Sequence, residues 1–142
     1  MKNVSEYLKS NRLKLATISS DMIRKELDVG RSDLAEAVDG LSRQAYKWTT
    51  IQAYYAIFHG MRALLFTAGL REESHLALRV AIQELYVATG KLSEDSYRAL
   101  ERGMELREMA DYKATFSRDT ASWLVERAKT CLDEIEKLIP PT

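Results

Sequence analysis

Residues 53–65 read AYYAIFHGMRALL, and they are so apolar that the helix carrying them must lie at the centre of the fold. We expect this helix to run from Trp48 to about Ala68. Its core stripe consists of Tyr54, Phe58, Met61, Leu65 and Ala68. A second, partly polar stripe consists of Tyr55, His59, Arg62 and Phe66. Because helical bundles build sites from inward polar groups, Tyr55, His59 and Arg62 are candidate ligand-binding residues.

Hydrophobic periodicity and capping residues predict further helices on both sides of this segment. They are expected over about residues 3–27, from Ser32 to between residues 43 and 46, from residue 74 to Gly90, from Ser93 to about Tyr112, and from Ser117 or Asp119 to Pro140. The sequence Asp28-Val29-Gly30 is expected to break the first helix. The predicted class is all-α: an antiparallel up-and-down bundle of four to five core helices with an additional N-terminal helix. Residues 1–30 would be an extension packed on a bundle of residues 31–142.

The composition limits the classes of function. The 142 residues suit one domain, and 21 basic side chains balance 21 acidic ones, so there is no global basic field for nucleic acid. The single cysteine, Cys131, excludes an internal disulfide and a cysteine-based zinc cluster. The N-terminus resembles no signal peptide, and no apolar run approaches the roughly 20 residues of a membrane helix. We therefore expect a cytoplasmic protein without membrane contact.

The strongest candidate for a catalytic or binding site lies near the end of the predicted helix from Ser93 to Tyr112. Leu100, Met104, Arg107 and Asp111 follow four-three-four spacing, so a cation and a carboxylate continue an apolar row. Arg107 and Asp111 have a plain interpretation as a surface ion pair, which contributes a few tenths of a kcal/mol. The alternative is a site in which Arg107 binds phosphate and Asp111 or Tyr112 orients a hydroxyl or a water.

Familiar catalytic motifs are missing from the chain. It has no Gly-rich phosphate loop, no HExxH or GxSxG motif and no paired metal-ligand spacing. The two histidines, His59 and His75, are too few for a histidine-rich metal centre. We therefore predict neither a metal nor a cofactor.

Three segments together are similar to a known family: residues 53–65, residues 73–75 (Glu-Ser-His), and Leu106-Arg107 followed by Ala110-Asp111-Tyr112. In this order they resemble the HEPN domain, in particular its small single-domain prokaryotic branch, from about Asp33 to Ile139. The resemblance implies a helical bundle that pairs as a homodimer with a site in the dimer cleft. Many HEPN proteins are ribonuclease toxins whose antitoxin is a small nucleotidyltransferase encoded beside them.

The resemblance also implies roles for single residues. The ribonuclease motif of the family is an arginine, four to six residues and then a histidine; Arg107 matches the arginine, whereas Tyr112 follows where the histidine is expected. A tyrosine near this motif receives nucleotidyl groups in some toxin relatives. An unperturbed phenol, with a pKa near 10, is a poor base at neutral pH. Three functions therefore stay open: a module that binds a nucleotide or a nucleotidyltransferase, a metal-independent endoribonuclease acting on RNA, and a non-catalytic dimeric scaffold.

Overall fold

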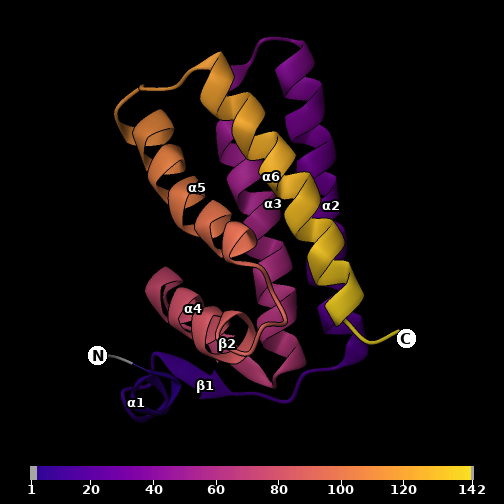
Figure 1. The fold of residues 1–142 in the computed structure, drawn as a ribbon, viewed down its shortest axis with the longest axis vertical. Coiled ribbons are helices and arrows are strands. Elements are labelled where there is room, and N and C mark those ends of the chain that lie inside the picture. The colour runs from indigo at the N-terminus through magenta and orange to yellow at the C-terminus, as the bar shows by residue number, and fades with distance from the viewer. Residues whose placement is uncertain (1–2, 142) are drawn as a thin grey trace.

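Four long helices form the body of the molecule, which we describe from a computed structural model over residues 3–141 (Figure 1). They are α2 (Ser20–Ser42), α3 (Tyr46–Thr67), α5 (Glu94–Tyr112) and α6 (Arg118–Leu138). Successive long helices run in opposite directions, and α3 packs against the other three. The predicted all-α up-and-down bundle and its central helix are confirmed.

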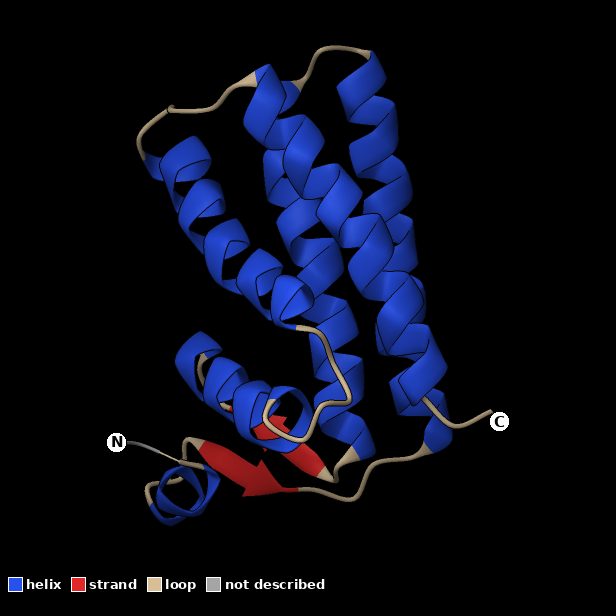
Figure 2. Cartoon of the chain, in the orientation of Figure 1, coloured by secondary structure: helices blue, strands red, loops and turns tan. Residues whose placement is uncertain are grey.

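A small cap closes one end of the bundle (Figure 2). It consists of α1 (Val4–Lys9), β1 (Leu13–Leu15), β2 (Leu70–Glu72), α4 (His75–Ile82) and the π-helical turn η1 (Gln83–Val87). The two strands are antiparallel, and Leu13 pairs with Glu72. Neither strand was predicted from the sequence. Within the cap, Glu72 is the last residue of β2 and His75 is the first residue of α4.

Serine side chains fix where several helices begin. Ser74, Ser93 and Ser117 precede α4, α5 and α6, and each side chain accepts a hydrogen bond from the N–H group three residues later. This is the standard N-cap arrangement, which satisfies an otherwise unpaired donor. The predicted starts near residues 74, 93 and 117 are therefore confirmed, and α5 ends at Tyr112 as expected.

The predicted first helix over residues 3–27 is wrong. The chain leaves α1 at Lys9, Asn11 adopts a positive φ of 62°, and β1 follows before Ser19 caps α2. The expected break at Asp28-Val29-Gly30 is also absent, because α2 continues to Ser42. Gly30 is helical for a packing reason: a Cβ there would lie 3.0 Å from the carbonyl oxygen of Ala56, so glycine lets α2 approach the α3 backbone. The segment predicted to start at Ser32 is accordingly the second half of α2.

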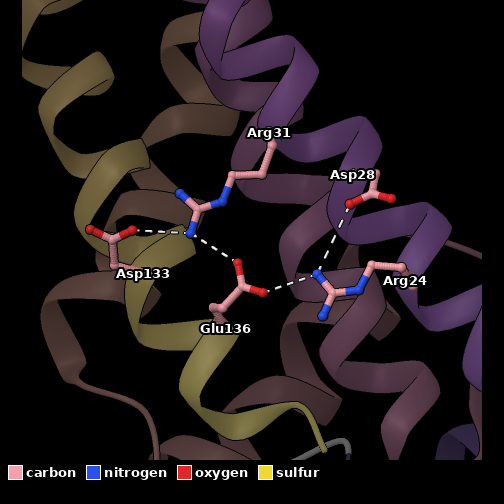
Figure 3. A network of polar contacts seen from close by, with 5 residues as sticks. All are labelled: Arg24, Asp28, Arg31, Asp133 and Glu136. Atoms are coloured by element: carbon pink, nitrogen blue, oxygen red, sulfur yellow. Dashed lines mark hydrogen bonds and ion pairs between the residues drawn. The ribbon is translucent and has the colours of Figure 1, made fainter. Parts of the chain in front are cut away.

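Ion pairs connect α2 to α6 along the outside of the bundle (Figure 3). The Glu136 carboxylate lies between two arginines of α2, with Oε2 3.0 Å from Arg24 and Oε1 3.1 Å from Arg31. Asp133 lies 3.0 Å from the same Arg31 nitrogen. These contacts align two helices that are far apart in the sequence. No helix among residues 3–141 is long and apolar enough to span a bilayer.

Candidate functional site

One face of α3 is incompletely covered by the rest of the protein. Between Thr49 and Leu65, the residues that are not buried are Gln52, Tyr55, His59 and Arg62. Their three-four-three spacing places them in one row along the helix. Side chains of α2 contact this row at His59, and Arg107 of α5 contacts it at Tyr55. The row that the sequence predicted as partly polar therefore lies between α2 and α5.

Arg107 points inward, and its side chain is only 13% exposed. Its guanidinium carbon lies 5.7 Å from the ring centres of both Tyr54 and Tyr55, and 5.9 Å from that of Tyr112. Each of these distances is within the range of a cation–π contact. The guanidinium is thus surrounded by aromatic rings that limit its contact with water.

The polar contacts of Arg107 leave hydrogen-bond donors of its guanidinium group without acceptors. Its Nη1 lies 3.8 Å from Oδ2 of Asp111, which is too long for a hydrogen bond. Its Nε is buried and has no hydrogen-bond partner among the described residues. The i,i+4 ion pair of the plain interpretation is present, but it leaves a planar donor group without an acceptor. An anion placed at the guanidinium would supply that acceptor.

The other two candidate catalytic residues lie at the surface. Asp111 is exposed, and Tyr112, the last residue of α5, is 75% exposed. Both are on the same helix end as Arg107, so the structure keeps Arg107, Asp111 and Tyr112 together. The phenol oxygen of Tyr112 has the access to solvent that a group contacting a large ligand or partner needs.

His59 and Arg62 belong to a network of charges between α2, α3 and β2. Nδ1 of His59 lies 2.7 Å from one oxygen of Glu26, and Nη1 of Arg62 lies 3.6 Å from the other. Arg62 also donates two hydrogen bonds, of 2.9 and 2.6 Å, to one oxygen of Glu72. Burial alone would raise the pKa of Glu26, but His59 and Arg62 lower it below its ordinary value. Unlike Arg107, Arg62 therefore donates hydrogen bonds to a carboxylate.

His75 lies near Arg107 and was not among the site residues predicted from the sequence. Its Nδ1 lies 2.7 Å from the hydroxyl of Tyr54, whose side chain is fully buried. A buried phenol needs an acceptor for its proton, so we assign Nδ1 as that acceptor and Nε2 as the protonated nitrogen of the neutral ring. Burial, followed by the charge of Arg107, lowers the pKa of His75 below its ordinary value. This shift favours the neutral ring. Tyr54 contacts both His75 and Arg107.

Neither metal ligation nor thiol chemistry is evident in the described part of the chain. Among residues 3–141, no group of three or more His, Cys, Asp or Glu side chains is arranged to hold a metal ion. Cys131 of α6 is fully buried, and burial raises the pKa of its thiol to about 12. A thiol of this kind is unreactive, so Cys131 is a packing residue.

Comparisons with known proteins agree with this architecture. A family model described as the HEPN domain matches residues 20–139. The chain is 33% identical over 88 residues to a Thermotoga maritima protein named "UPF0332 protein", a match that covers 61% of this chain and 67% of the relative. Two Methanocaldococcus jannaschii proteins, both named "Putative toxin", are 26% and 19% identical; each match covers 82% of this chain, with 88% and 81% of the relatives. The family match covers α2 to α6 and the whole Arg107 site, and on this evidence the chain belongs to the HEPN domain family.

Proposed function

We propose that this chain is a HEPN protein of the toxin–antitoxin type in which Arg107 binds the phosphate of a nucleotide, either within RNA or presented by a nucleotidyltransferase partner. The observation that carries the proposal is the state of Arg107: a mostly buried guanidinium between aromatic rings, with Nε unpartnered among the described residues. The toxin role is supported by the names of the two archaeal relatives.

The chemistry of the site suits a phosphate ester. A guanidinium cannot lose its proton at physiological pH, and its fork of N–H groups matches two phosphate oxygens. The rings of Tyr55 and Tyr112 flank it, and exposed aromatic faces can stack on a base. Because the surroundings are partly desolvated, a charge-assisted hydrogen bond formed there is stronger than one in open water.

We also propose that the chain pairs as a homodimer, which the uncovered row of α3 supports. Gln52, Tyr55, His59 and Arg62 are incompletely buried although they lie on the central helix of the bundle. A second copy of the chain packed over this row would bury it and would place the two Arg107 sites near the same interface. In this arrangement the ligand is bound in a cleft between the protomers.

His75 favours metal-independent RNA cleavage as a second candidate function. The motif histidine is absent after Arg107, but the Tyr54 contact places an imidazole with a lowered pKa beside the same site. An imidazole that is neutral at pH 7 can exchange a proton, and Arg107 would stabilise the negative charge that develops on the phosphate. In this reaction His75 reacts as the tautomer whose Nδ1–H donates to the Tyr54 oxygen, so that Nε2 takes the proton of the ribose 2′-hydroxyl as the 2′-oxygen bonds to phosphorus. The bond from phosphorus to the 5′-oxygen breaks, and the imidazolium returns its proton to that leaving oxygen.

Expression in a bacterial host tests these functions with two matched variants. Arg107→Ala removes the proposed binding group, whereas Arg102→Ala removes an exposed arginine of the same helix that pairs with Glu105. We expect a co-expressed small nucleotidyltransferase of the antitoxin type to co-purify with wild type and with Arg102→Ala, and at least tenfold less with Arg107→Ala. Equal recovery with all three proteins would exclude a partner-presented phosphate at Arg107.

The same cultures separate the candidate functions. Growth arrest with RNA fragmentation that requires both Arg107 and His75 identifies the ribonuclease. Partner or RNA binding that requires Arg107 without any fragmentation identifies the binding module. If Arg107→Ala changes only the dimer dissociation measured by light scattering, the chain is a scaffold and the proposed function is wrong.

A further inference from the structure

The outer edge of strand β1 carries backbone hydrogen-bonding groups without partners. In an antiparallel pair, only alternate residues of a strand exchange hydrogen bonds with the neighbouring strand. The N–H group of Ala16 donates to Gly69 in the register of this pair, so residues 12, 14 and 16 are the ones that bond toward β2. The N–H and C=O groups of Leu13 and Leu15 therefore point away from β2, and they have no hydrogen-bond partner among the described residues.

The same edge is open to a partner on its apolar side. β1 packs against β2 and α1, whereas β2 also packs against α3 and α4, so β1 is the outer strand of the cap (Figure 2). Leu13 is buried, but Leu15, the next residue on the same face of β1, is 79% exposed. An open groove of about 390 Å³ is lined by Leu13, Lys14 and Leu15, together with Leu8 of α1 and Asn11. A segment lying in this groove would contact both the unpaired backbone and the exposed leucine.

The opposite face of the two strands is positively charged. Side chains alternate between the faces of a strand, so Arg12, Lys14 and Arg71 share this face, and all three are exposed. Lys14 is the register partner of Arg71, and like charges directly opposite each other on two strands are unfavourable. Glu73 lies 3.4 Å from Lys14 and offsets one of the three cations. Arg12 and Arg71 form no ion pair with another residue of the described range, so added carboxylates would stabilise this face.

We propose that the outer edge of β1 binds an extended segment of a partner protein in which apolar and acidic residues alternate. The segment adds as a third, antiparallel strand, and its backbone bonds to the N–H and C=O groups of Leu13 and Leu15. Residues opposite each other on neighbouring strands share a face, so its apolar side chains contact Leu15 and its acidic side chains contact Arg12 and Lys14. The main-chain hydrogen bonds supply affinity, and the alternating side chains supply specificity.

Two other occupants fit these observations less well. A second copy of β1 paired with the first would place Arg12 and Lys14 of both chains on one face, where like charges repel. Single-stranded nucleic acid would meet the cations, but it has no ladder of amide groups to pair with Leu13 and Leu15. The proposal is also independent of the Arg107 site, because β1 precedes residue 20, where the HEPN match begins.

Fluorescence anisotropy of a labelled peptide, Glu-Val-Glu-Val-Glu-Val-Glu, tests the proposal on the full-length chain. We expect it to bind at least tenfold more tightly than Lys-Val-Lys-Val-Lys-Val-Lys, which keeps the apolar residues and reverses the charge. The double variant Arg12→Ala, Lys14→Ala should bind the acidic peptide at least tenfold more weakly, and Leu15→Ala several-fold more weakly. The matched control Lys91→Ala, Arg98→Ala removes two exposed cations elsewhere on the surface and should bind as wild type does.

Methylated peptides test the backbone pairing separately from the charge, and they need no variant of the protein. In the antiparallel arrangement the N–H groups of the valines point toward β1, whereas those of the glutamates point toward solvent. N-methylation of the valines should therefore weaken binding at least tenfold, and N-methylation of the glutamates should change it less than threefold. Hydrogen exchange at the amides of Leu13 and Leu15 should also slow in the complex, whereas exchange at Lys14, which already bonds toward β2, should change little.

Three results would overturn the proposal. The first is no binding of the acidic peptide at millimolar concentration, and the second is equal affinity for the unmodified and the valine-methylated peptides. The third is binding of a uridine oligonucleotide that requires Arg12 and Lys14 while the acidic peptide does not bind, which would assign this face to nucleic acid. None of these results affects the proposed function, and Arg107→Ala should leave the affinity for the acidic peptide unchanged.

Discussion

The hydroxyl of Tyr54 lies 2.7 Å from Nδ1 of His75, and this contact joins the middle of the central helix to the first turn of α4. Because Tyr54 also contacts the Arg107 guanidinium, the cap and the end of α5 meet at one buried ring. The stability of this part of the fold and the chemistry of the site therefore depend on the same residue.

Tyr54→Phe should destabilise the protein by about 1–2 kcal/mol, because it removes a hydroxyl and leaves a partly buried imidazole nitrogen unpaired. Urea unfolding followed by circular dichroism measures the change. Tyr55→Phe is the control: the Tyr55 hydroxyl has no hydrogen bond to another described residue, so its loss should change stability by less than about 0.5 kcal/mol. Equal losses of unfolding free energy in the two variants would contradict a stabilising role of the Tyr54–His75 hydrogen bond.

The unfolding free energy should fall as the pH is lowered through about 6.5, the ordinary pKa of histidine. The pKa of His75 is lowered in the folded protein, chiefly by burial and Arg107, with Arg62 acting in the same direction and Glu72 and Glu108 opposing it. In this window the unfolded chain binds more protons than the folded one, so acid favours unfolding. The slope measured between pH 7 and 5.5 should become smaller in His75→Gln. An NMR titration in which His75 has a pKa above 6.5 would reverse the expected sign.

Gly30→Ala should destabilise the protein although alanine is the better helix former. The added methyl group would lie 3.0 Å from the carbonyl oxygen of Ala56 and 3.5 Å from the backbone nitrogen of Gly60. These backbone atoms cannot move aside as a side chain can, and a forced separation of helices typically costs about 1–3 kcal/mol, whereas the helix propensity gained is at most about 1 kcal/mol. Thermal unfolding measures the net effect. An increase in the melting temperature would show that α2 and α3 separate without cost.

Glu136→Gln should lower stability by less than about 1 kcal/mol at low salt, because the contacts of Glu136 with Arg24 and Arg31 are partly exposed. Hydrogen bonds from these arginines lower the pKa of Glu136, so its contribution is present above the ordinary pKa of a glutamate and is lost as acid protonates it. Unfolding in 0.1 and 1 M salt tests the electrostatic origin, since the difference from wild type should shrink at high salt. Glu126→Gln, which affects one exposed pair with Lys129, is the matched control.

Three of the four long helices, α3, α5 and α6, were predictable from the sequence because their signals are local. Apolar periodicity and the serine caps gave α3, α5 and α6 nearly the bounds that the structure shows. The inward position of Arg107 also followed from periodicity, since it continues the row of Leu100 and Met104. Local patterns of this kind suffice to predict the bounds and the buried face of a helix that packs along its whole length.

Other features depend on contacts between residues far apart in the sequence. Leu13 and Glu72 pair in strands of three residues each, which are too short to show a pattern of their own. Gly30 was predicted from the sequence to end a helix. The need for glycine there comes from the close approach of the α3 backbone, which a local pattern does not reveal. The role of His75 depends on Tyr54, which is 21 residues away, and no periodicity in the sequence joins two residues at that distance.

The most direct test of the account is the affinity of a short single-stranded RNA for three proteins: wild type, Arg107→Ala and Arg102→Ala. Fluorescence anisotropy at several salt concentrations measures both the affinity and the number of phosphate contacts. We predict at least a tenfold loss of affinity and a salt dependence smaller by about one contact for Arg107→Ala, with Arg102→Ala behaving as wild type. Equal affinity and equal salt dependence for wild type and Arg107→Ala would contradict the claim that Arg107 binds phosphate in RNA.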